Sequence, residues 1–96
     1  MPPLGRRIRF ASVLFRYPGK GGWTFAPVPK AVAPKPTRPW GRTPVEATVD
    51  KITWTTSLWR DSKNDRSLLA VPKAKRPGKG HGDAVRVTIR VIKDED

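Results

Sequence analysis

The segment Val85-Arg86-Val87-Thr88-Ile89-Arg90-Val91 alternates apolar and polar residues without interruption. Neighbouring side chains of a β-strand point to opposite faces of a sheet, so this segment is predicted to be a strand with one buried and one solvated face. Together with it, the chain is predicted to contain six short strands. The five other runs with strand character are residues 8–15, 23–28, 45–49, 52–58 and 67–71.

Proline and glycine separate these runs. The chain has 11 prolines and 8 glycines, and five of the prolines lie within residues 29–44. Proline interrupts helical hydrogen bonding, and no long stretch has the 3.6-residue apolar period of an amphipathic helix. A length of 96 residues fits one domain spanning residues 1–96. The expected fold class is therefore all-β with little helix, a small six-stranded β-barrel whose closure leaves no strand edge unpaired.

A few side chains are expected to have structural roles. Trp23 and Phe25 share one face of their strand, and Trp54 alternates with other apolar residues, so all three are expected in or over the core. Gly82 and Asp83 are expected to form a tight turn into the last strand. In that turn the Asp83 carboxylate would accept hydrogen bonds from backbone amides two residues further on.

The tetrapeptide Val-Pro-Lys-Ala occurs twice, at residues 28–31 and 71–74. Each copy follows the second arm of a predicted hairpin and precedes a basic connection and an alternating strand. This shared order predicts two half-repeats, at about residues 8–50 and 51–93, related by an internal pseudo-twofold axis. Two such open three-stranded units can bury each other's apolar faces.

Two segments of the second half resemble the half-barrel of AbrB/MazE-type proteins: Leu69-Ala70-Val71-Pro72-Lys73 and Gly82-Asp83-Ala84-Val85-Arg86-Val87. Over about residues 8–92, the chain more closely resembles the bacterial family described as domain of unknown function 1905. This resemblance implies a double-split β-barrel made of two fused half-barrels, and it implies no activity. The residues that carry it are Phe10, Leu14, Trp23, Phe25, Val28-Pro29, the run 45–50, Trp54, Ser57-Leu58, Val71-Pro72-Lys73 and Gly82-Asp83-x-Val85.

The charge of the chain is strongly positive and uneven. Twenty Lys and Arg against eight Asp and Glu give a formal net charge of +12. Three of the acids form a tail at residues 94–96, so residues 1–93 carry +15. Such a charge density attracts polyanions, although it also keeps a small protein soluble.

The basic residues fall into three groups, and the last two occupy equivalent connections of the two half-repeats. We therefore expect a non-enzymatic module that binds nucleic acid or another polyanion through these two connections. Trp40 and Trp59, near strand ends and close in sequence to arginines, are candidate stacking platforms for bases. The first group is Arg6, Arg7 and Arg9; the two connections carry Lys30, Lys35, Arg38 and Arg42, and Lys73, Lys75, Arg76 and Lys79.

Two other classes of function stay open. The proline-rich residues 29–44 could contact a protein partner, and a barrel mouth near Trp40 or Trp59 could hold a small molecule or a reaction centre. The chain has no cysteine and a single histidine, His81, which excludes thiol chemistry and any site with two histidine ligands. We expect no catalytic, metal or cofactor-binding residues, and a monomeric cytoplasmic protein, since no export signal or membrane-spanning run is evident.

Overall fold

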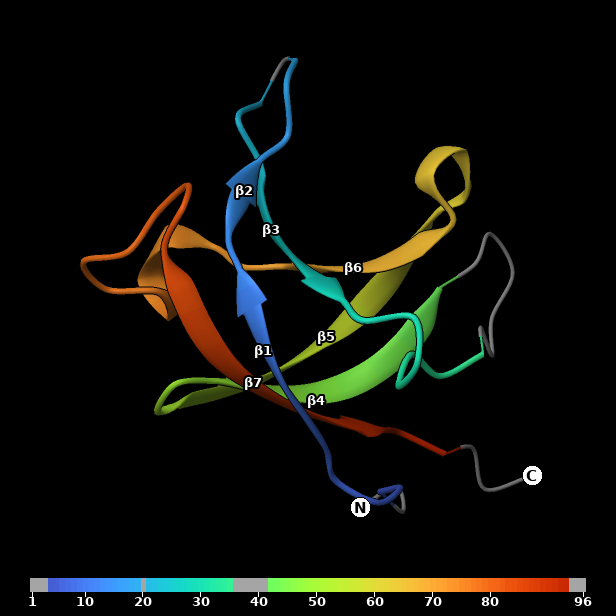
Figure 1. Ribbon diagram of the computed structural model, residues 1–96. Helices are drawn as coiled ribbons and strands as arrows, with labels where there is room; N and C mark the ends of the chain where they lie inside the picture. Colours follow the sequence, from blue (N-terminus) through green and yellow to red (C-terminus); the bar gives the residue numbers. More distant parts are fainter. Residues whose placement is uncertain (1–3, 20, 36–41, 94–96) are drawn as a thin grey trace.

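The computed structural model describes residues 4–19, 21–35 and 42–93, and these form an all-β structure in which a single sheet nearly closes into a barrel (Figure 1). The predicted fold class is confirmed. The helical elements of the described residues are 3₁₀ turns of three residues. The strands are β1 (Ile8–Val13), β2 (Phe15–Arg16), β3 (Thr24–Val28), β4 (Thr43–Val49), β5 (Ile52–Asp61), β6 (Arg66–Ala70) and β7 (Ala84–Val91); the turns are η2 (Ser62–Asn64) and η3 (Lys73–Lys75).

The strands follow the order β1-β7-β4-β5-β6-β3-β2, and all pairs are antiparallel. There are seven strands instead of the expected six because the first run is divided at Leu14. The Leu14 amide donates to the Asp83 carbonyl (2.9 Å), and the Gly82 amide donates to the Leu14 carbonyl (2.8 Å). From Phe15 onward the chain pairs with β3 instead of β7. One continuous run therefore forms both edge strands of the sheet and brings the two edges together in a nearly closed barrel.

The pairing scheme is symmetric between the two halves of the chain. If β1 and β2 are exchanged with β5, β3 with β6 and β4 with β7, every pair of neighbouring strands is retained. The registers agree as well. Ala26 pairs with Leu69, and each stands two residues before the valine of a Val-Pro-Lys segment. Thr48 pairs with Thr88, and each is the fourth residue of its alternating run. The pseudo-twofold repeat predicts this arrangement.

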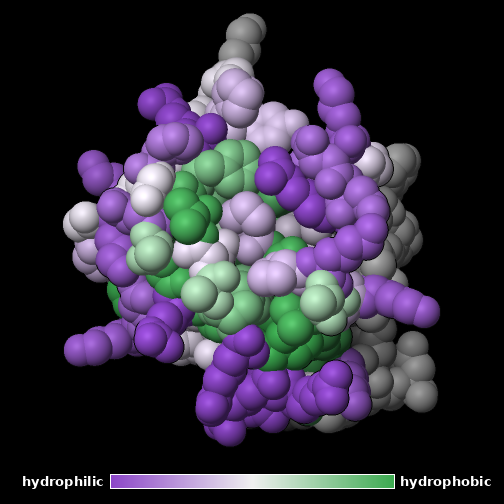
Figure 2. Space-filling model, in the orientation of Figure 1, coloured by the Kyte–Doolittle hydropathy of each residue, from purple (hydrophilic) through white to green (hydrophobic). Residues whose placement is uncertain are grey.

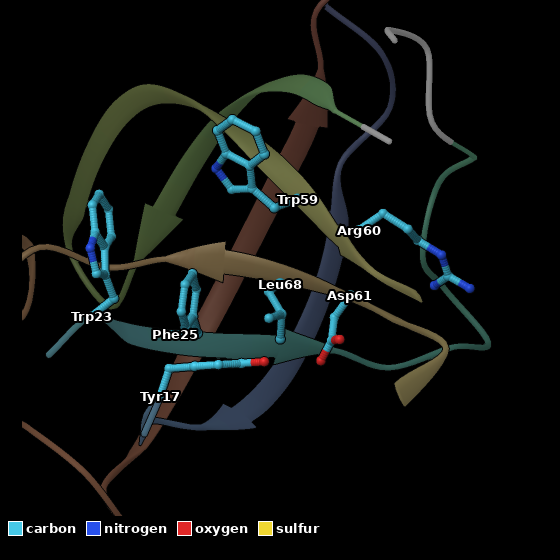
Figure 3. A pocket seen from close by; sticks show the side chains of 7 residues that line it. All are labelled: Tyr17, Trp23, Phe25, Trp59, Arg60, Asp61 and Leu68. Carbon is cyan, nitrogen blue, oxygen red and sulfur yellow. The ribbon is translucent and has the colours of Figure 1, made fainter. Parts of the chain in front are cut away.

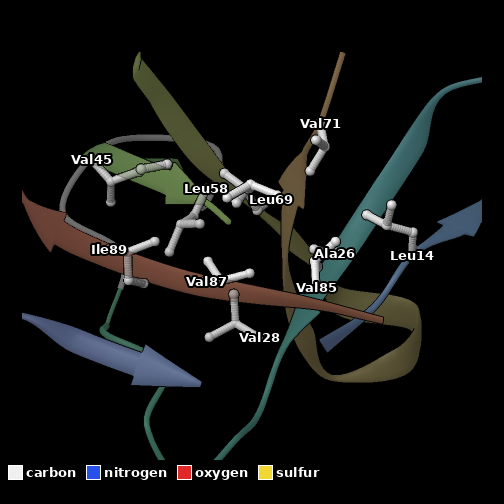
Figure 4. Close-up of a cluster of buried hydrophobic side chains, with 12 residues drawn as sticks. Leu14, Ala26, Val28, Val45, Leu58, Leu69, Val71, Val85, Val87 and Ile89 are labelled. Carbon is white, nitrogen blue, oxygen red and sulfur yellow. The ribbon is translucent and has the colours of Figure 1, made fainter. Parts of the chain in front are cut away.

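The core lies inside the barrel and is built from alternate residues of the strands (Figure 4). Val45, Ala47 and Val49 of β4 are at most 1% exposed, while the residues between them are half-buried. β7 repeats the pattern with Val85, Val87 and Ile89. The remaining buried members of the cluster are Leu14, Ala26, Val28, Leu58, Leu69 and Val71.

The aromatic residues expected in the core divide between the two faces of the barrel. Trp54 is half-buried and packs against the core, as expected. The expectation for Trp23 is wrong, because its side chain is 60% exposed. Phe25 is half-buried, and it alternates with the buried residues Thr24 and Ala26, so it lies on the outer face of β3. The inward positions of β3 belong to the smaller residues because the narrow interior is already filled by branched aliphatic side chains.

Gly82 and Asp83 form the expected turn before β7. Gly82 has φ +89°, a conformation that glycine adopts without a steric penalty. The hydrogen bond of Asp83 differs from the expectation: its carboxylate accepts from the Gly80 amide (2.8 Å), three residues earlier in the chain. No helix within the described residues is long and apolar enough to cross a membrane.

Candidate functional site

The basic residues of the second connection are largely engaged within the protein. The Lys79 ammonium donates to the Asp50 carboxylate (2.9 Å) and to the Ala84 carbonyl (2.8 Å). The Arg76 guanidinium donates to the carbonyls of Val71 and Lys79, both at 2.9 Å. These hydrogen bonds hold the second connection against the barrel. Lys79 and Arg76 therefore have fewer N–H groups left to bind an external anion.

The first connection and its surroundings show similar internal contacts. Lys30 and Arg60 both pair with Asp65 in the hairpin between β5 and β6. Lys75, in the second connection, lies over the Trp54 ring at 5.9 Å from its centroid. Figure 1 shows the segment after β3 and the segment before β7 on different sides of the barrel. The described parts of the two connections therefore lie apart. On the face seen in Figure 2, the hydrophilic side chains stand in several separate groups around a more apolar centre.

The other predicted members of the basic site are placed as follows. Lys35, Arg42 and Lys73 are exposed. Arg38 and Trp40 lie outside the described residues. Trp59 is 45% exposed on the outer face of β5, which agrees with its expected accessibility as a stacking platform.

A groove of about 740 Å³ lies beside the start of β1, where the first basic group meets the segment after β3. We call it the arginine groove. Its charged lining residues are Arg6, Arg7, Arg9 and Lys93, and all four are exposed. Its remaining lining is Gly5, Ile8, Ala31, Val32, Ala33, Pro34 and Val91.

Backbone contacts hold the arginine groove in shape. The Gly5 amide donates to the Val91 carbonyl (2.8 Å), and Leu4 bridges to Ile92. The Arg90 guanidinium donates to the Gly5 carbonyl (2.8 Å). The segment that carries Arg6 and Arg7 is thereby tied to the end of β7. The sequence shows this basic cluster, but not that residues 5–9, 31–34 and 91–93 meet around one groove.

A second groove, of about 350 Å³, lies on the outer face of β2, β3, β5 and β6 (Figure 3). We call it the aromatic groove. It is lined by Tyr17, Trp23, Phe25, Trp59, Arg60, Asp61 and Leu68. The sequence indicates Trp59 as a possible stacking platform, but it does not indicate Tyr17 or Trp23 as part of the same site. The signal that could have indicated them is their position beside the glycine-rich turn at residues 18–22, because residues next to a projecting turn lie near the barrel surface.

Three aspartates near these features have pKa values below the ordinary range. For Asp50, the causes are a hydrogen bond from the Arg86 amide (3.0 Å) and then the Lys79 ammonium. For Asp61, whose side chain is 8% exposed, they are the Asn64 amide and then the Arg66 guanidinium. The pKa of Asp65 is lowered by Lys30 and then Arg60. All three carboxylates therefore stay ionised at neutral pH.

His81 takes part in the packing of its loop. Its Nδ1 accepts a hydrogen bond from the Arg16 backbone amide at 2.9 Å, which links the connection before β7 to β2. Within the described residues, no three His, Asp or Glu side chains gather in a way that could hold a metal ion.

These features define a class of protein: a small β-barrel with a basic groove at one end and an aromatic groove on its outer wall. The model of the family described as domain of unknown function (DUF1905) matches residues 10–89. The chain belongs to this family. A comparison with curated proteins finds no match.

Proposed function

We propose that this protein is a monomeric, non-enzymatic module that binds nucleic acid, and that the arginine groove makes the phosphate contacts. The observation that carries the proposal is the composition of that groove. Arg6, Arg7, Arg9 and Lys93 line it, and no acidic residue is among its described lining residues.

Collecting four like charges around one groove is unfavourable unless an anion compensates them. Three of the four are arginines, whose planar guanidinium forks bind phosphate oxygens in a bidentate manner. The net charge of +12 adds long-range attraction for a polyanion. Release of condensed counterions then drives the binding of a phosphodiester backbone.

This proposal moves the phosphate contacts away from the two Val-Pro-Lys connections. Lys30, Arg76 and Lys79 each have partners inside the protein. An external phosphate would have to displace the Asp50 or Asp65 carboxylate or a backbone carbonyl to reach them. Among the described residues, no hydrogen bond or ion pair engages the side chains of the four cations of the arginine groove, so a phosphate would displace no described partner there.

Fluorescence anisotropy with a labelled single-stranded DNA 12-mer at about 50 and about 500 mM salt tests the proposal. The wild type is expected to bind at low salt and to lose most of its affinity at high salt. The triple variant Arg6→Gln, Arg7→Gln, Arg9→Gln is expected to bind more weakly. Its slope of log affinity against log salt should be smaller by about two to three, at roughly 0.7 to 0.9 per lost phosphate contact.

A matched control removes three positive charges elsewhere, by Lys51→Gln, Lys63→Gln and Arg86→Gln. All three residues are exposed and lie outside the arginine groove. The control should retain most of the affinity and the wild-type salt slope. Absence of binding at 50 mM salt would overturn the proposal. Equal weakening in both triple variants would show that net charge acts without the groove.

A further inference from the structure

The barrel exposes aromatic side chains that its core does not use. Five large hydrophobic side chains are exposed among the described residues, and Tyr17, Trp23 and Trp59 of the aromatic groove are three of them. Their exposed fractions are 38%, 60% and 45%. Single exposed apolar residues are ordinary, but several gathered in one depression are typical of a binding site.

The rings hold one another in fixed orientations. Phe25 lies at the centre, 5.9 Å from Tyr17 in an edge-to-face arrangement and 6.4 Å from Trp23 with the two planes 15° apart. Phe15 packs on Phe25 from β2 at 5.9 Å, and the Arg66 guanidinium lies over the Phe15 ring. Phe15, Tyr17, Phe25 and Trp23 therefore pack side by side, and these ring contacts restrict the rearrangement that a ligand would have to impose.

The arrangement suits a flat ligand with a polar edge. Figure 3 shows Trp59 and Tyr17 on opposite sides, with Phe25 and Leu68 between them, Trp23 toward one end and Asp61 toward the other. The exposed face of an aromatic side chain in such a depression can stack on a planar ring, and the apolar floor excludes water from it. The Asp61 side chain is 8% exposed, and its Oδ2 already accepts from Asn64 and Arg66. Among the contacts of the described residues, its Oδ1 is the oxygen left to accept from a ring or exocyclic N–H group.

The charges around the groove decide between ligands that aromatic surfaces bind. Aromatic cages also bind quaternary ammonium groups. In this protein, however, Arg60 lines the groove, and the Arg66 guanidinium packs on the ring of Phe15, which contacts Phe25. The Arg16 guanidinium lies close to Gly22, the residue that precedes Trp23. It is so close that a Cβ atom at position 22 would be only 2.6 Å from it. Arg60 and Arg66 are paired with Asp65 and Asp61, so three guanidinium groups against two carboxylates leave one net positive charge beside the groove. This charge disfavours a cationic ligand and favours the phosphates that flank a nucleobase.

We propose that the aromatic groove binds an unstacked nucleobase, so that the nucleic acid recognised by this protein is single-stranded. This inference rests on the proposed function, because the phosphate contacts of the arginine groove supply the general affinity. The aromatic groove adds a contribution that only an exposed base can provide. Bases in a duplex are stacked and paired, and their faces are closed to Trp23 and Trp59.

Fluorescence anisotropy tests this inference by measuring the affinity of the protein for three probes. The probes are a single-stranded thymidine 12-mer, an abasic 12-mer with the same phosphates, and a 12-base-pair duplex. The wild type is expected to bind the thymidine strand at least tenfold more tightly than the abasic strand, as one or two stacked bases would give. Trp59→Ala and Trp23→Ala should each remove most of this difference. Both should leave the salt-dependent affinity for the abasic strand unchanged.

Two controls separate loss of stacking from loss of structure. Val13→Ala removes an exposed apolar side chain outside the groove and should behave as the wild type. Trp59→Phe keeps an aromatic face and should retain most of the preference for the thymidine strand. Circular dichroism checks that each variant keeps its β-sheet.

The outcomes distinguish this inference from the proposed function. Equal affinity of the wild type for the thymidine and abasic strands, or a duplex bound as tightly as the thymidine strand, would overturn the inference and leave the polyanion proposal standing. An unchanged preference in Trp59→Ala and Trp23→Ala would also overturn it. No binding of any probe at low salt would overturn both proposals.

Discussion

Asp50 combines an uncommon backbone conformation with two carboxylate contacts to residues that are distant in the sequence. It has φ 53°, in the left-handed region that Asp and Asn tolerate better than most residues. Its two carboxylate oxygens accept from the Arg86 amide (3.0 Å) and the Lys79 ammonium (2.9 Å). The turn between β4 and β5 is thereby tied to β7 and to the loop before it.

These contacts predict a loss of stability in acid. The pKa of Asp50 is lowered in the folded protein, first by the Arg86 amide and then by Lys79. A carboxylate with a depressed folded-state pKa contributes stability that is present above its unfolded pKa, near 4, and is lost as the pH falls through the folded value. Asp50→Asn should therefore lower the free energy of unfolding at pH 7 and reduce its decrease between pH 5 and pH 3, measured by urea unfolding.

Glu46→Gln provides the comparison, because it removes one carboxylate from β4 without touching this turn. Glu46 pairs with Thr55 and Arg90 across the sheet. If Asp50→Asn kept the full pH dependence of the wild type, the contacts of Asp50 would not account for the acid sensitivity. Asp61 and Asp65 also have lowered pKa values, so part of the dependence should remain in either variant.

Residue patterns in the sequence identified which side chains share a face, but not always which face is buried. Trp23 and Phe25 share one face as predicted, but this face is the outer one. The smaller Ala26 and Val28 lie on the inner face. Alternation has period two and is unchanged when the two faces of a strand are exchanged. The choice depends on the space left by the other strands.

At the scale of elements, the run 8–16 is the part of the barrel that the sequence described least well. β1 pairs with β7 and β2 pairs with β3, and the chain changes partner at Leu14. Between β1 and β3, a side chain supplies a link: the Ser12 hydroxyl donates to the Pro27 carbonyl at 2.7 Å. Ser12 is a buried polar residue, at 9% exposure.

Removal of this link should weaken the closure of the barrel. Ser12→Ala leaves the Pro27 carbonyl without that donor in a partly buried position, and we expect a loss of about 1 to 2 kcal/mol in the free energy of unfolding by urea denaturation. Ser57→Ala on β5, a half-buried position, should change the stability by less than about 0.5 kcal/mol. Equal effects in the two variants would indicate that the Ser12 contact has no special part in closure.

The bounds of the other strands agree closely with the sequence patterns. The alternating runs 45–49 and 52–58 lie within β4 and β5, and the run 85–91 lies within β7. The loop between β5 and β6 contains Asn64 and Asp65, residue types that favour turns, and Asp65 has φ 50°. The sequence predicts these strand bounds well because alternation and turn residues act over only a few neighbouring positions.

At the scale of the whole molecule, the two half-repeats depend on each other. The pairs β1–β7, β4–β7, β4–β5 and β3–β6 each join a strand of residues 8–50 to a strand of residues 51–93. Within each half, only the β2–β3 or the β5–β6 pair remains. A two-stranded hairpin is marginally stable at best in water.

The fragments 1–50 and 51–96 should therefore each be unfolded alone and should form the barrel when mixed. Far-UV circular dichroism and size-exclusion chromatography of the separate and mixed fragments measure this. Mixing should produce a β-sheet spectrum and a complex with the mass of the intact chain. A stable β-sheet in either separate fragment would contradict the prediction, because it would require a core that one half can bury by itself.

The sequence by itself determined the all-β class, most strand positions and the symmetric order of the two halves. These follow from period-two alternation, from proline and glycine placement and from the repeated Val-Pro-Lys-Ala segment, which are all local in the chain. The tertiary structure decided the sites. The arginine groove joins residues 5–9 to residues 31–34 and 91–93, and the aromatic groove joins residues 17–25 to residues 59–68. Such sites form only when strands distant in sequence pair and the sheet curves into a barrel. The sequence therefore gives the number of charged and aromatic residues, while the curvature of the sheet decides where they gather.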